Sequence, residues 1–335
     1  MNASIEKIQA GQNLTSLEIE EAMRFIISGQ AQEAQIKDFL LALNTKGPTV
    51  EEITGAAKIM RQFALPIKAS AKVILDTCGT GGDKKGTFNI STLVALTVAS
   101  LGVTVAKHGN RSVSSKCGSA DILEALGVNL ELEEKRLSEC LNQVGIAFLF
   151  AQKMHPAMKN VAPARQALGV RTIFNILGPL TNPANATHQI MGVYGRDLLE
   201  PMAHVLKNLG LKKALVVHGA DGLDELTTTT KSYVSEFDGR EIVSYDIDPQ
   251  ELGFSLGRAS DLKGGDLKTN VRIAQDVLKG RKGPQQDIVV LNAAYALYVA
   301  ERVPNVREGI EAAQEALASG RSAKKLQQLI EFTRD

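Results

Sequence analysis

The segment 73–92, VILDTCGTGGDKKGTFNIST, combines glycines with hydroxyl and amide side chains in a pattern that suits phosphate binding. Its glycines include Gly79, Gly81 and Gly82. Glycine lets backbone N–H groups come close to an anion, and a helix beginning near Ser91 would direct its positive end to the same place. The Ser91 hydroxyl also suits Mg²⁺, and Asn89 and Thr92 add further polar groups. Because serine is a common helix N-cap, a purely structural role for Ser91 is the alternative.

Two common phosphate-binding motifs do not fit this loop. A P-loop needs Gly, four residues and then Gly-Lys-Ser/Thr; Gly81 and Gly86 have that spacing, but Thr87 stands where the lysine should be. The dinucleotide fingerprint needs its third glycine where Lys84 stands. The loop therefore suits a phosphate but belongs to neither class.

A second loop, residues 107–121 (KHGNRSVSSKCGSAD), carries fixed positive charge. Lys107, Arg111 and Lys116 are separated by glycine and serine, and Ser119 is placed to cap the next helix. Cations, hydroxyls and backbone amides together can hold a multiply charged phosphate group. An ordinary solvated basic loop is the alternative, but the position beside the first loop favours binding.

Two other segments add a metal site and a carboxylate site. In 218–226 (HGADGLDEL), Asp224 and Glu225 offer the hard oxygen ligands that Mg²⁺ prefers, although adjacent carboxylates are also common on surfaces. The segment 155–183 contains Arg165 and Arg171, and arginine is the natural bidentate partner of a carboxylate. His155 in the same segment could gate or contact a ligand; a structural role is the commoner one for a lone histidine.

Other common catalytic patterns are absent from the sequence. There is no nucleophile elbow, no His/Glu zinc motif and no kinase or Walker signature, and the three cysteines are not spaced as metal ligands. The residues therefore indicate an enzyme that handles a phosphorylated small molecule bound to Mg²⁺, with catalysis by positioning and electrostatics.

The elements that must position these residues follow an α/β pattern. Strands are expected at 73–75, 103–106, 146–150, 189–194 and 215–218. Helices are expected at 91–101, 119–126, 133–144 and 197–209. This alternation predicts a central, mostly parallel sheet flanked by helices, with ligands beyond the carboxyl ends of the strands. A hairpin at 233–245 and a mostly helical stretch at 269–332 complete the chain.

Residues 1–65 show helical patterns only. Capping-box signals begin at Thr15 and Thr49, and a third amphipathic helix lies between them. Its apolar positions are Ile36, Phe39, Leu40 and Leu43.

Composition limits the class of protein. The 335 residues are 44% hydrophobic and 22% charged, which is typical of a globular chain long enough for two domains. Lys and Arg number 38 against 37 Asp and Glu, so there is no general basic field for nucleic acid. Three cysteines, no signal-peptide pattern and no apolar run of about 20 residues predict a cytoplasmic protein that does not enter a membrane.

The chemistry-bearing motifs occur in one order along the chain. They are 79–83 (GTGGD), 87–92 (TFNIST), 107–111 (KHGNR), 114–115 (SS), 118–121 (GSAD), 169–183 (GVRTIFNILGPLTNP) and 222–225 (GLDE). As an ordered set they closely resemble the anthranilate phosphoribosyltransferase family of tryptophan biosynthesis, over essentially the whole chain. The resemblance implies transfer of the phosphoribosyl group from phosphoribosyl diphosphate (PRPP) to the amine of anthranilate, with Mg²⁺, giving N-(5-phosphoribosyl)anthranilate and pyrophosphate.

The resemblance also implies roles for individual residues. Contacts to PRPP fall on Gly79, Gly82, Asp83, Thr87, Asn89, Ile90, Ser91, Thr92, Lys107, His108, Gly109, Asn110, Arg111, Ser112, Val113, Ser114, Ser115 and Ser119. Ligands of Mg²⁺ fall on Ser91, Asp224 and Glu225. Contacts to anthranilate fall on Asn110 and Arg165, with the backbone of Gly79 close by.

The implied fold has a small all-helical domain, residues 1–66, and a larger α/β domain that binds PRPP, residues 67–335. Helices near 155–180 are expected to pack on the helical domain, through which family members usually form homodimers. No dedicated nucleophile or base is expected, because departure of pyrophosphate should lead the reaction; His108 is the candidate proton acceptor.

Two departures and two alternatives accompany the resemblance. Lys84 stands where glycine is frequent in relatives, and Cys117 stands where a smaller or hydroxyl residue is expected. A pyrimidine nucleoside phosphorylase of the same fold is the nearest alternative, and Arg165 with the 175–183 segment favours the amine acceptor over it. A non-catalytic paralogue that binds nucleic acid is the other; the net charge of +1 speaks against it.

Overall fold

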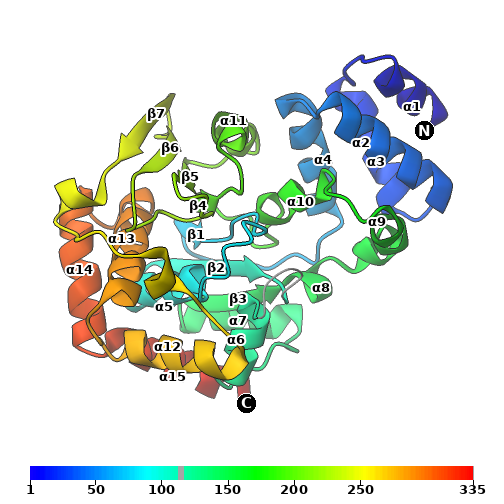
Figure 1. Cartoon of the computed structure of the whole chain (residues 1–335). Coiled ribbons are helices and arrows are strands. Elements are labelled where there is room, and N and C mark those ends of the chain that lie inside the picture. Colours follow the sequence, from blue (N-terminus) through cyan, green and yellow to red (C-terminus); the bar gives the residue numbers. More distant parts are fainter. Residues whose placement is uncertain (112–116, 335) are drawn as a thin grey trace.

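The computed structural model describes residues 1–111 and 117–334, and the described part contains a seven-stranded sheet (Figure 1). The order across the sheet is β3-β2-β1-β4-β5-β6-β7. The strands are β1 (Ile74–Asp76), β2 (Thr104–Gly109), β3 (Ile146–Phe150), β4 (His188–Gly192), β5 (Lys213–Gly219), β6 (Ser232–Phe237) and β7 (Ile242–Ile247). Strands β3, β2, β1, β4 and β5 run parallel, whereas β6 and β7 pair antiparallel. The expected α/β fold and the expected hairpin are both confirmed.

Both faces of the sheet are covered by helices. Along β5, Leu215 and Val217 join one hydrophobic core, whereas Ala214 and Val216 join a second one, as the alternation of side chains along a strand requires. The helices of the α/β part are α5 (Ile90–Ser100), α6 (Ser119–Ala125), α7 (Glu134–Gln143), α8 (Ala151–Met154), α9 (Ala162–Leu168), α10 (Phe174–Leu177), α11 (Leu199–Asn208), α12 (Leu267–Leu278), α13 (Pro284–Val299), α14 (Val306–Ala318) and α15 (Arg321–Arg334). None of the described helices is long and apolar enough to cross a membrane.

Short 3₁₀ helices occupy several of the connections. They are η1 (Pro156–Asn160), η2 (Gly178–Leu180), η3 (Arg196–Leu198), η4 (Pro249–Leu252) and η5 (Ala259–Leu262). η1 and η2 lie in the segment that precedes β4, which is the segment that carries Arg165 and Arg171.

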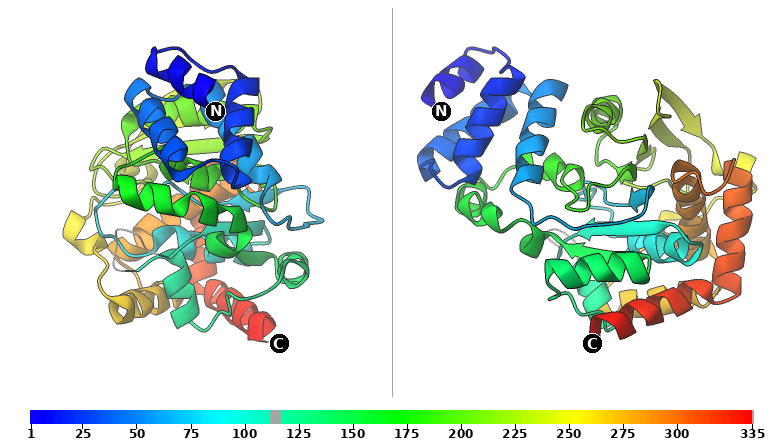
Figure 2. Two further views of the ribbon diagram at one scale, coloured as in Figure 1. Left: turned by 90° about the vertical axis from the view of Figure 1, so that its right-hand side faces the viewer. Right: turned by 180° about the vertical axis from the view of Figure 1, so that it is seen from behind.

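Four N-terminal helices stand to one side of the sheet, away from the C-terminal helices (Figures 1 and 2). They are α1 (Asn2–Gln9), α2 (Ser16–Ile27), α3 (Glu33–Lys46) and α4 (Val50–Gln62). The capping boxes of Thr15 and Thr49 are both present, so these predicted helix starts are confirmed. α9 packs on α3, and Asn160 Nδ2 donates a hydrogen bond of 2.9 Å to Ile27 O.

The end of β2 differs from the one that the sequence predicts. The pattern ends this strand at residue 106, but the strand continues to Gly109, because Lys107, His108 and Gly109 pair in parallel with the last residues of β3. Pairing with a neighbouring strand overrides the low strand preference of lysine and glycine. The side chains of Lys107 and His108 are consequently held by the sheet and are buried, instead of lying in a loop.

Candidate active site

The glycine loop that follows β1 lies across the end of β4. Thr80 N–H donates to Gly192 O at 2.8 Å, and Tyr194 N–H donates to Thr80 Oγ1 at 3.1 Å. A Cβ atom at Gly79 would lie 2.8 Å from Gly192 O, closer than a carbon and an oxygen can approach. Position 79 therefore requires glycine because the backbone of β4 lies so close to it.

Three carboxylates from two loops meet beside the glycine loop. Asp83 Oδ2 is buried and has no hydrogen-bond partner among the described residues, and Asp83 lies close enough to raise the pKa of Asp224. The backbone N–H groups of Gly81 and Ser91 act to lower the pKa values of Asp224 and Glu225 respectively, so these two amides lie close to the carboxylates. Two backbone donors thus reach this acidic cluster from the glycine loop and from the start of α5.

Desolvation and mutual repulsion oppose negative charge on the acidic cluster. Burial, followed by the charge of Asp83, raises the pKa of Asp224 to about 7. Burial and the neighbouring Asp224 raise the pKa of Glu225 well above its usual range, and the Lys107 charge opposes this effect. Carboxylates that are close together and desolvated bind a divalent cation readily, because the cation removes their repulsion.

Lys107 completes this charged region. Its side chain is only 3% exposed, and Nζ lies 3.3 Å from Ser91 Oγ and 3.4 Å from Thr77 O. Hard oxygen ligands, an unpartnered oxygen of Asp83 and the Ser91 hydroxyl fit Mg²⁺. The structure therefore brings Asp224 and Glu225 to Asp83, Ser91 and Lys107, which lie more than 100 positions earlier in the sequence.

The loop that carries the acids is shaped by contacts that the sequence did not suggest. Asp221 Oδ2 accepts hydrogen bonds from Thr227 Oγ1 at 2.7 Å and from Thr229 Oγ1 at 2.5 Å. A Cβ atom at Gly192, the last residue of β4, would lie 1.5 Å from Asp224 O. The acidic loop therefore packs directly on the β4 backbone, and only glycine allows this approach.

A second group of side chains could in principle bind a metal, but its carboxylate is engaged in hydrogen bonds inside the protein. Atoms of Asp76, Cys78 and His108 lie within 4.8 Å of one another. However, Asp76 accepts hydrogen bonds from Cys78 N–H at 3.1 Å, His108 N–H at 3.2 Å and Asn182 Nδ2 at 2.7 Å. Burial raises the pKa of Cys78 to about 12, so the thiol stays protonated. This network joins the glycine loop to β2 and to Asn182, and neither Asp76 nor Asn182 was singled out in the sequence.

His108 and His155 form a pair that the sequence did not reveal. Their Nε2 atoms are 3.2 Å apart, and His108 Nδ1 lies 3.1 Å from Gly178 O. Burial lowers the pKa of His155 to about 4 and, together with the His155 charge, lowers the pKa of His108 well below its usual range. Both rings are neutral at physiological pH, which makes His108 a weak base.

The two arginines of the 155–183 segment have different surroundings. Arg165 lies over the Phe174 ring, with Cζ 5.4 Å from its centroid, and no carboxylate of the described residues pairs with it. Burial lowers the pKa of Arg165. Arg171 lies 3.9 Å from the Tyr194 ring centroid and reaches the glycine loop.

The basic loop lies partly outside the described residues. Ser112, Val113, Ser114 and Ser115 are among the residues that the structure does not describe. The Arg111 guanidinium bonds Asp121 at 3.0 Å and Glu124 at 2.8 Å, so its charge faces α6. Ser119 Oγ donates to Asn110 O at 3.2 Å.

Near the start of α5, some side chains offer polar atoms and others are buried in the core. Asn89 Nδ2 donates to Cys117 O at 3.1 Å, while its Oδ1 is buried without a partner among the described residues. The backbone of Thr87 pairs with that of Lys263 in an isolated antiparallel β-bridge. Ile90 and Thr92 are 2% and 1% exposed, so their side chains belong to the core and only their backbone can face a ligand.

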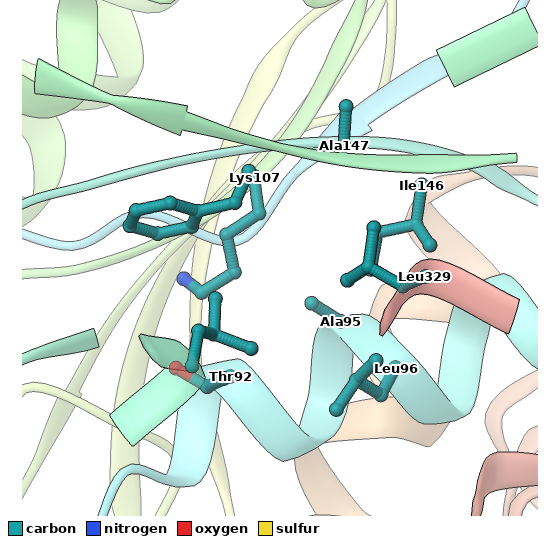
Figure 3. Close-up of a pocket in the computed structure, with 9 residues that line it drawn as sticks. Thr92, Ala95, Leu96, Lys107, Ile146, Ala147 and Leu329 are labelled. Carbon is teal, nitrogen blue, oxygen red and sulfur yellow. The ribbon is translucent and has the colours of Figure 1, made fainter. Parts of the chain in front are cut away.

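A small cavity lies on the inner side of Lys107 (Figure 3). Its volume is about 10 Å³, and its lining includes Thr92, Ala95, Leu96, Lys107, Ile146, Ala147 and Leu329. This space is about the size of one water molecule, and its accessible lining is apolar. The cavity is too small for a substrate.

Comparison with known proteins agrees with this arrangement. Residues 71–323 match the description "Glycosyl transferase family, a/b domain", and residues 3–64 match "Glycosyl transferase family, helical bundle domain". The chain is 51% identical over 333 residues to an anthranilate phosphoribosyltransferase of Acetivibrio thermocellus, covering 99% of this chain and 96% of that protein. The crystal structure of anthranilate phosphoribosyltransferase from Thermus thermophilus superposes with a TM-score of 0.94 at 43% identity, covering 99% of both chains.

A more distant structure is informative about ligands. The anthranilate phosphoribosyltransferase from Saccharomyces cerevisiae in complex with PRPP and Mg superposes with a TM-score of 0.91 at 27% identity, covering 99% of this chain and 97% of that one. The fold and the acidic site thus define a glycosyl transferase with a helical bundle domain and an α/β domain. Within that class, the chain belongs to the anthranilate phosphoribosyltransferase family.

Proposed function

We propose that this chain transfers the phosphoribosyl group of PRPP to the amine of anthranilate, releasing pyrophosphate, as a step of tryptophan biosynthesis. The acidic cluster with buried Lys107 beside the glycine loop supports this function most directly, because a diphosphate with Mg²⁺ needs both oxygen ligands and a fixed cation. Homology at 51% identity over 99% of the chain supports the same reaction.

The donor would bind along the glycine loop and the start of α5. Ser91, Asp224 and Glu225 would hold Mg²⁺, with Asp83 close enough to take part. The metal supplies positive charge to the leaving diphosphate when it is bound. Lys107 holds a second positive charge next to Ser91 and is fixed in place by the sheet.

The acceptor would bind on the side of Arg165. Its guanidinium is half-buried and lacks a carboxylate partner among the described residues, and an aromatic ring lies against it. A desolvated guanidinium of this kind favours a bound carboxylate such as that of anthranilate. The neutral pair of His108 and His155 contributes polar surface without adding charge.

The chemistry needs little from a general base. An aromatic amine is a weak nucleophile, so departure of the diphosphate leads and C1 of the ribose gains positive character. The amine becomes acidic as it attacks, and its proton can pass to water or to the released pyrophosphate. The chain's contribution is to orient the two substrates and to stabilise charge on the leaving oxygens through fixed N–H groups and Lys107.

A direct assay tests the activity. Protein, PRPP, MgCl₂ and anthranilate are mixed, and the loss of anthranilate fluorescence is followed. Release of free base from thymidine or uridine with inorganic phosphate is the matching assay for a nucleoside phosphorylase. Phosphorolysis without any loss of anthranilate would contradict the proposed function, and so would a salt-dependent shift of single-stranded DNA in a catalytically silent protein.

Arg165→Ala is expected to raise the KM for anthranilate about ten- to a hundredfold, with a much smaller effect on the KM for PRPP. The reason is loss of one charge-assisted contact of about 1.5–3 kcal/mol to the acceptor carboxylate. Steady-state kinetics with each substrate varied in turn measure both constants.

The matched control for this variant is Arg136→Ala. Arg136 also lies over a phenylalanine ring, with Cζ 3.8 Å from the Phe332 centroid, but it is remote from the proposed site. Its removal should leave both KM values near those of the wild type. Equal losses for PRPP and anthranilate in Arg165→Ala would indicate a general structural role instead.

Stabilisation by Mg²⁺ is expected to increase with pH. The pKa of Asp224 is raised from 3.8 to about 7, so its contribution to the stability of the metal-free fold is full below 3.8 and is lost as the pH rises from there through about 7. Mg²⁺ binds the deprotonated form and must displace the proton at lower pH. The rise in Tm caused by MgCl₂ should therefore be small near pH 5.5 and full near pH 8. Equal rises at both pH values would contradict the assignment, and Asp224→Asn should show a reduced rise at both.

We also propose a homodimer formed through the helical domain, in the cytoplasm. Leu17 on α2 and Leu41 on α3 are large apolar side chains that remain 66% and 43% exposed in the single chain. Exposed leucines on neighbouring helices suit burial against a second copy. Light scattering measures the molar mass of the wild type, which is expected to be a dimer, and of Leu17→Asp, which is expected to dimerise less. A monomeric wild type would contradict this proposal.

A further inference from the structure

Arg171 joins two parts of the site that the sequence keeps far apart. Its Nη2 atom donates a hydrogen bond of 2.5 Å to Gly82 O in the glycine loop. Its guanidinium also lies over the Tyr194 ring, with Cζ 3.9 Å from the centroid. Arg171 itself lies between α9 and α10, in the segment that carries Arg165.

Tyr194 is well placed to support this contact. It follows β4, and its backbone N–H group donates to Thr80 Oγ1 at 3.1 Å. The glycine loop is therefore held at two points. The backbone of Tyr194 holds it at Thr80, and the side chain of Arg171, which lies on the Tyr194 ring, holds it at Gly82. The second attachment depends on a side chain, so it can be removed without touching the strand.

Holding the Gly82 carbonyl has a geometric consequence for the acidic cluster. The peptide between Gly82 and Asp83 is planar, so fixing the carbonyl oxygen also fixes the direction of the Asp83 N–H group. Gly82 has a φ of +78°, a conformation that glycine adopts freely and leaves freely. Without the arginine, this peptide would have one restraint fewer, and Asp83, whose Oδ2 lies in the acidic cluster, would be less well placed.

The same segment reaches the acceptor side. Arg165 lies over Phe174, and Arg171 lies between these two residues in the chain. One short segment thus presents one arginine toward the proposed anthranilate carboxylate and another toward the proposed diphosphate loop.

We propose that Arg171, resting on Tyr194, is a positioning residue that holds the glycine loop in its donor-binding form from the acceptor side of the site. This inference rests on the proposed phosphoribosyl transfer. A planar guanidinium can stack on a ring and donate a hydrogen bond from its edge at the same time, whereas the ammonium group of lysine cannot do both.

The experiment compares Arg171→Leu, Arg171→Lys and Tyr194→Leu with the wild type. We expect the KM for PRPP to rise about tenfold in all three, the size of one lost hydrogen bond to a charged group, with a smaller change in the KM for anthranilate at saturating PRPP. Tyr194→Phe, which keeps the ring, should restore most of what Tyr194→Leu loses. The double variant Arg171→Leu/Tyr194→Leu should be no worse than either single change, because both remove the same contact.

Arg196→Leu is the matched control. Arg196 lies over the Tyr233 ring at 3.6 Å, which is the same kind of contact on the surface near α11. Its removal should leave the KM for PRPP unchanged. Thermal melting of every variant shows whether the fold is kept, and calorimetry with Mg²⁺ and PRPP, without anthranilate, measures donor binding directly.

The outcomes separate the possible explanations. If Arg171→Lys keeps the wild-type KM and Tyr194→Leu has no effect, Arg171 touches the donor as a simple charge, and the positioning role is wrong. If all variants bind PRPP as the wild type does, Arg171 has no role in donor binding. A wild-type protein that binds PRPP but leaves anthranilate unchanged would contradict the proposed function and not this contact, because the calorimetric comparison of the variants would still stand.

Discussion

Replacing Asp224 and Glu225 together by Asn and Gln is expected to lower kcat/KM for PRPP by about a thousandfold, because two charged ligands of Mg²⁺ would be lost at once. The amides keep the size of the side chains, so the loop should keep its packing. Both groups have raised pKa values because they are desolvated next to other carboxylates. The neutral variant should therefore fold at least as stably as the metal-free wild type, while the rise in Tm caused by Mg²⁺ disappears.

The control for this variant is the pair Glu241→Gln and Asp246→Asn. Both carboxylates are exposed, in or beside β7, and lie outside the proposed site. This pair also removes two carboxyl groups from the chain, so a general effect of losing acidic side chains would appear in both double variants. A Mg²⁺ titration of activity that is unchanged in Asp224→Asn/Glu225→Gln would rule out these residues as metal ligands.

Gly192→Ala is expected to have the second large effect. The added Cβ would lie 1.5 Å from Asp224 O, so either the end of β4 or the acidic loop must move. Overpacking of this kind costs about 1–3 kcal/mol in stability. A displacement of the carboxylates by about 1 Å should lower activity by about a hundredfold. Thermal melting and kcat/KM measure the two consequences separately.

The control for Gly192→Ala is Gly257→Ala. At Gly257 the added carbon would meet Pro284 Cβ at 3.5 Å, which is an ordinary contact, and the backbone there is outside the left-handed region. This change should leave activity as it is. If Gly192→Ala melts and turns over like the wild type, the close approach of Asp224 to β4 plays no part in holding the acids.

Features that depend on neighbours in the chain could be predicted from the sequence. The glycine loop, the adjacent acids Asp224 and Glu225, and the capping boxes of Thr15 and Thr49 are local patterns, and the structure contains each of them. Lys84 is a further case, since its φ of +59° is a conformation in which glycine is less strained. Its departure from the family pattern was visible in the sequence alone.

Features that depend on pairing between distant segments could not be predicted. The extension of β2 to Gly109 requires the register with β3, and the bond from Asn182 to Asp76 joins residues 106 positions apart. The contact of His108 with His155 likewise needs the fold. Several predicted substrate contacts, including those of Arg111, stay predictions, because that guanidinium is paired with α6 in the structure.

The helical bundle shares its core with the rest of the chain, and this has a consequence for folding. The core that contains Phe39 and Ile59 continues through Val161 and Leu177 to Val216 on the sheet. Arg61 of α4 also donates to Leu180 O at 2.7 Å. The segment that families treat as a separate module therefore lacks a complete core of its own. We therefore expect both sides of the boundary near residue 65 to belong to one cooperative unit and to unfold together.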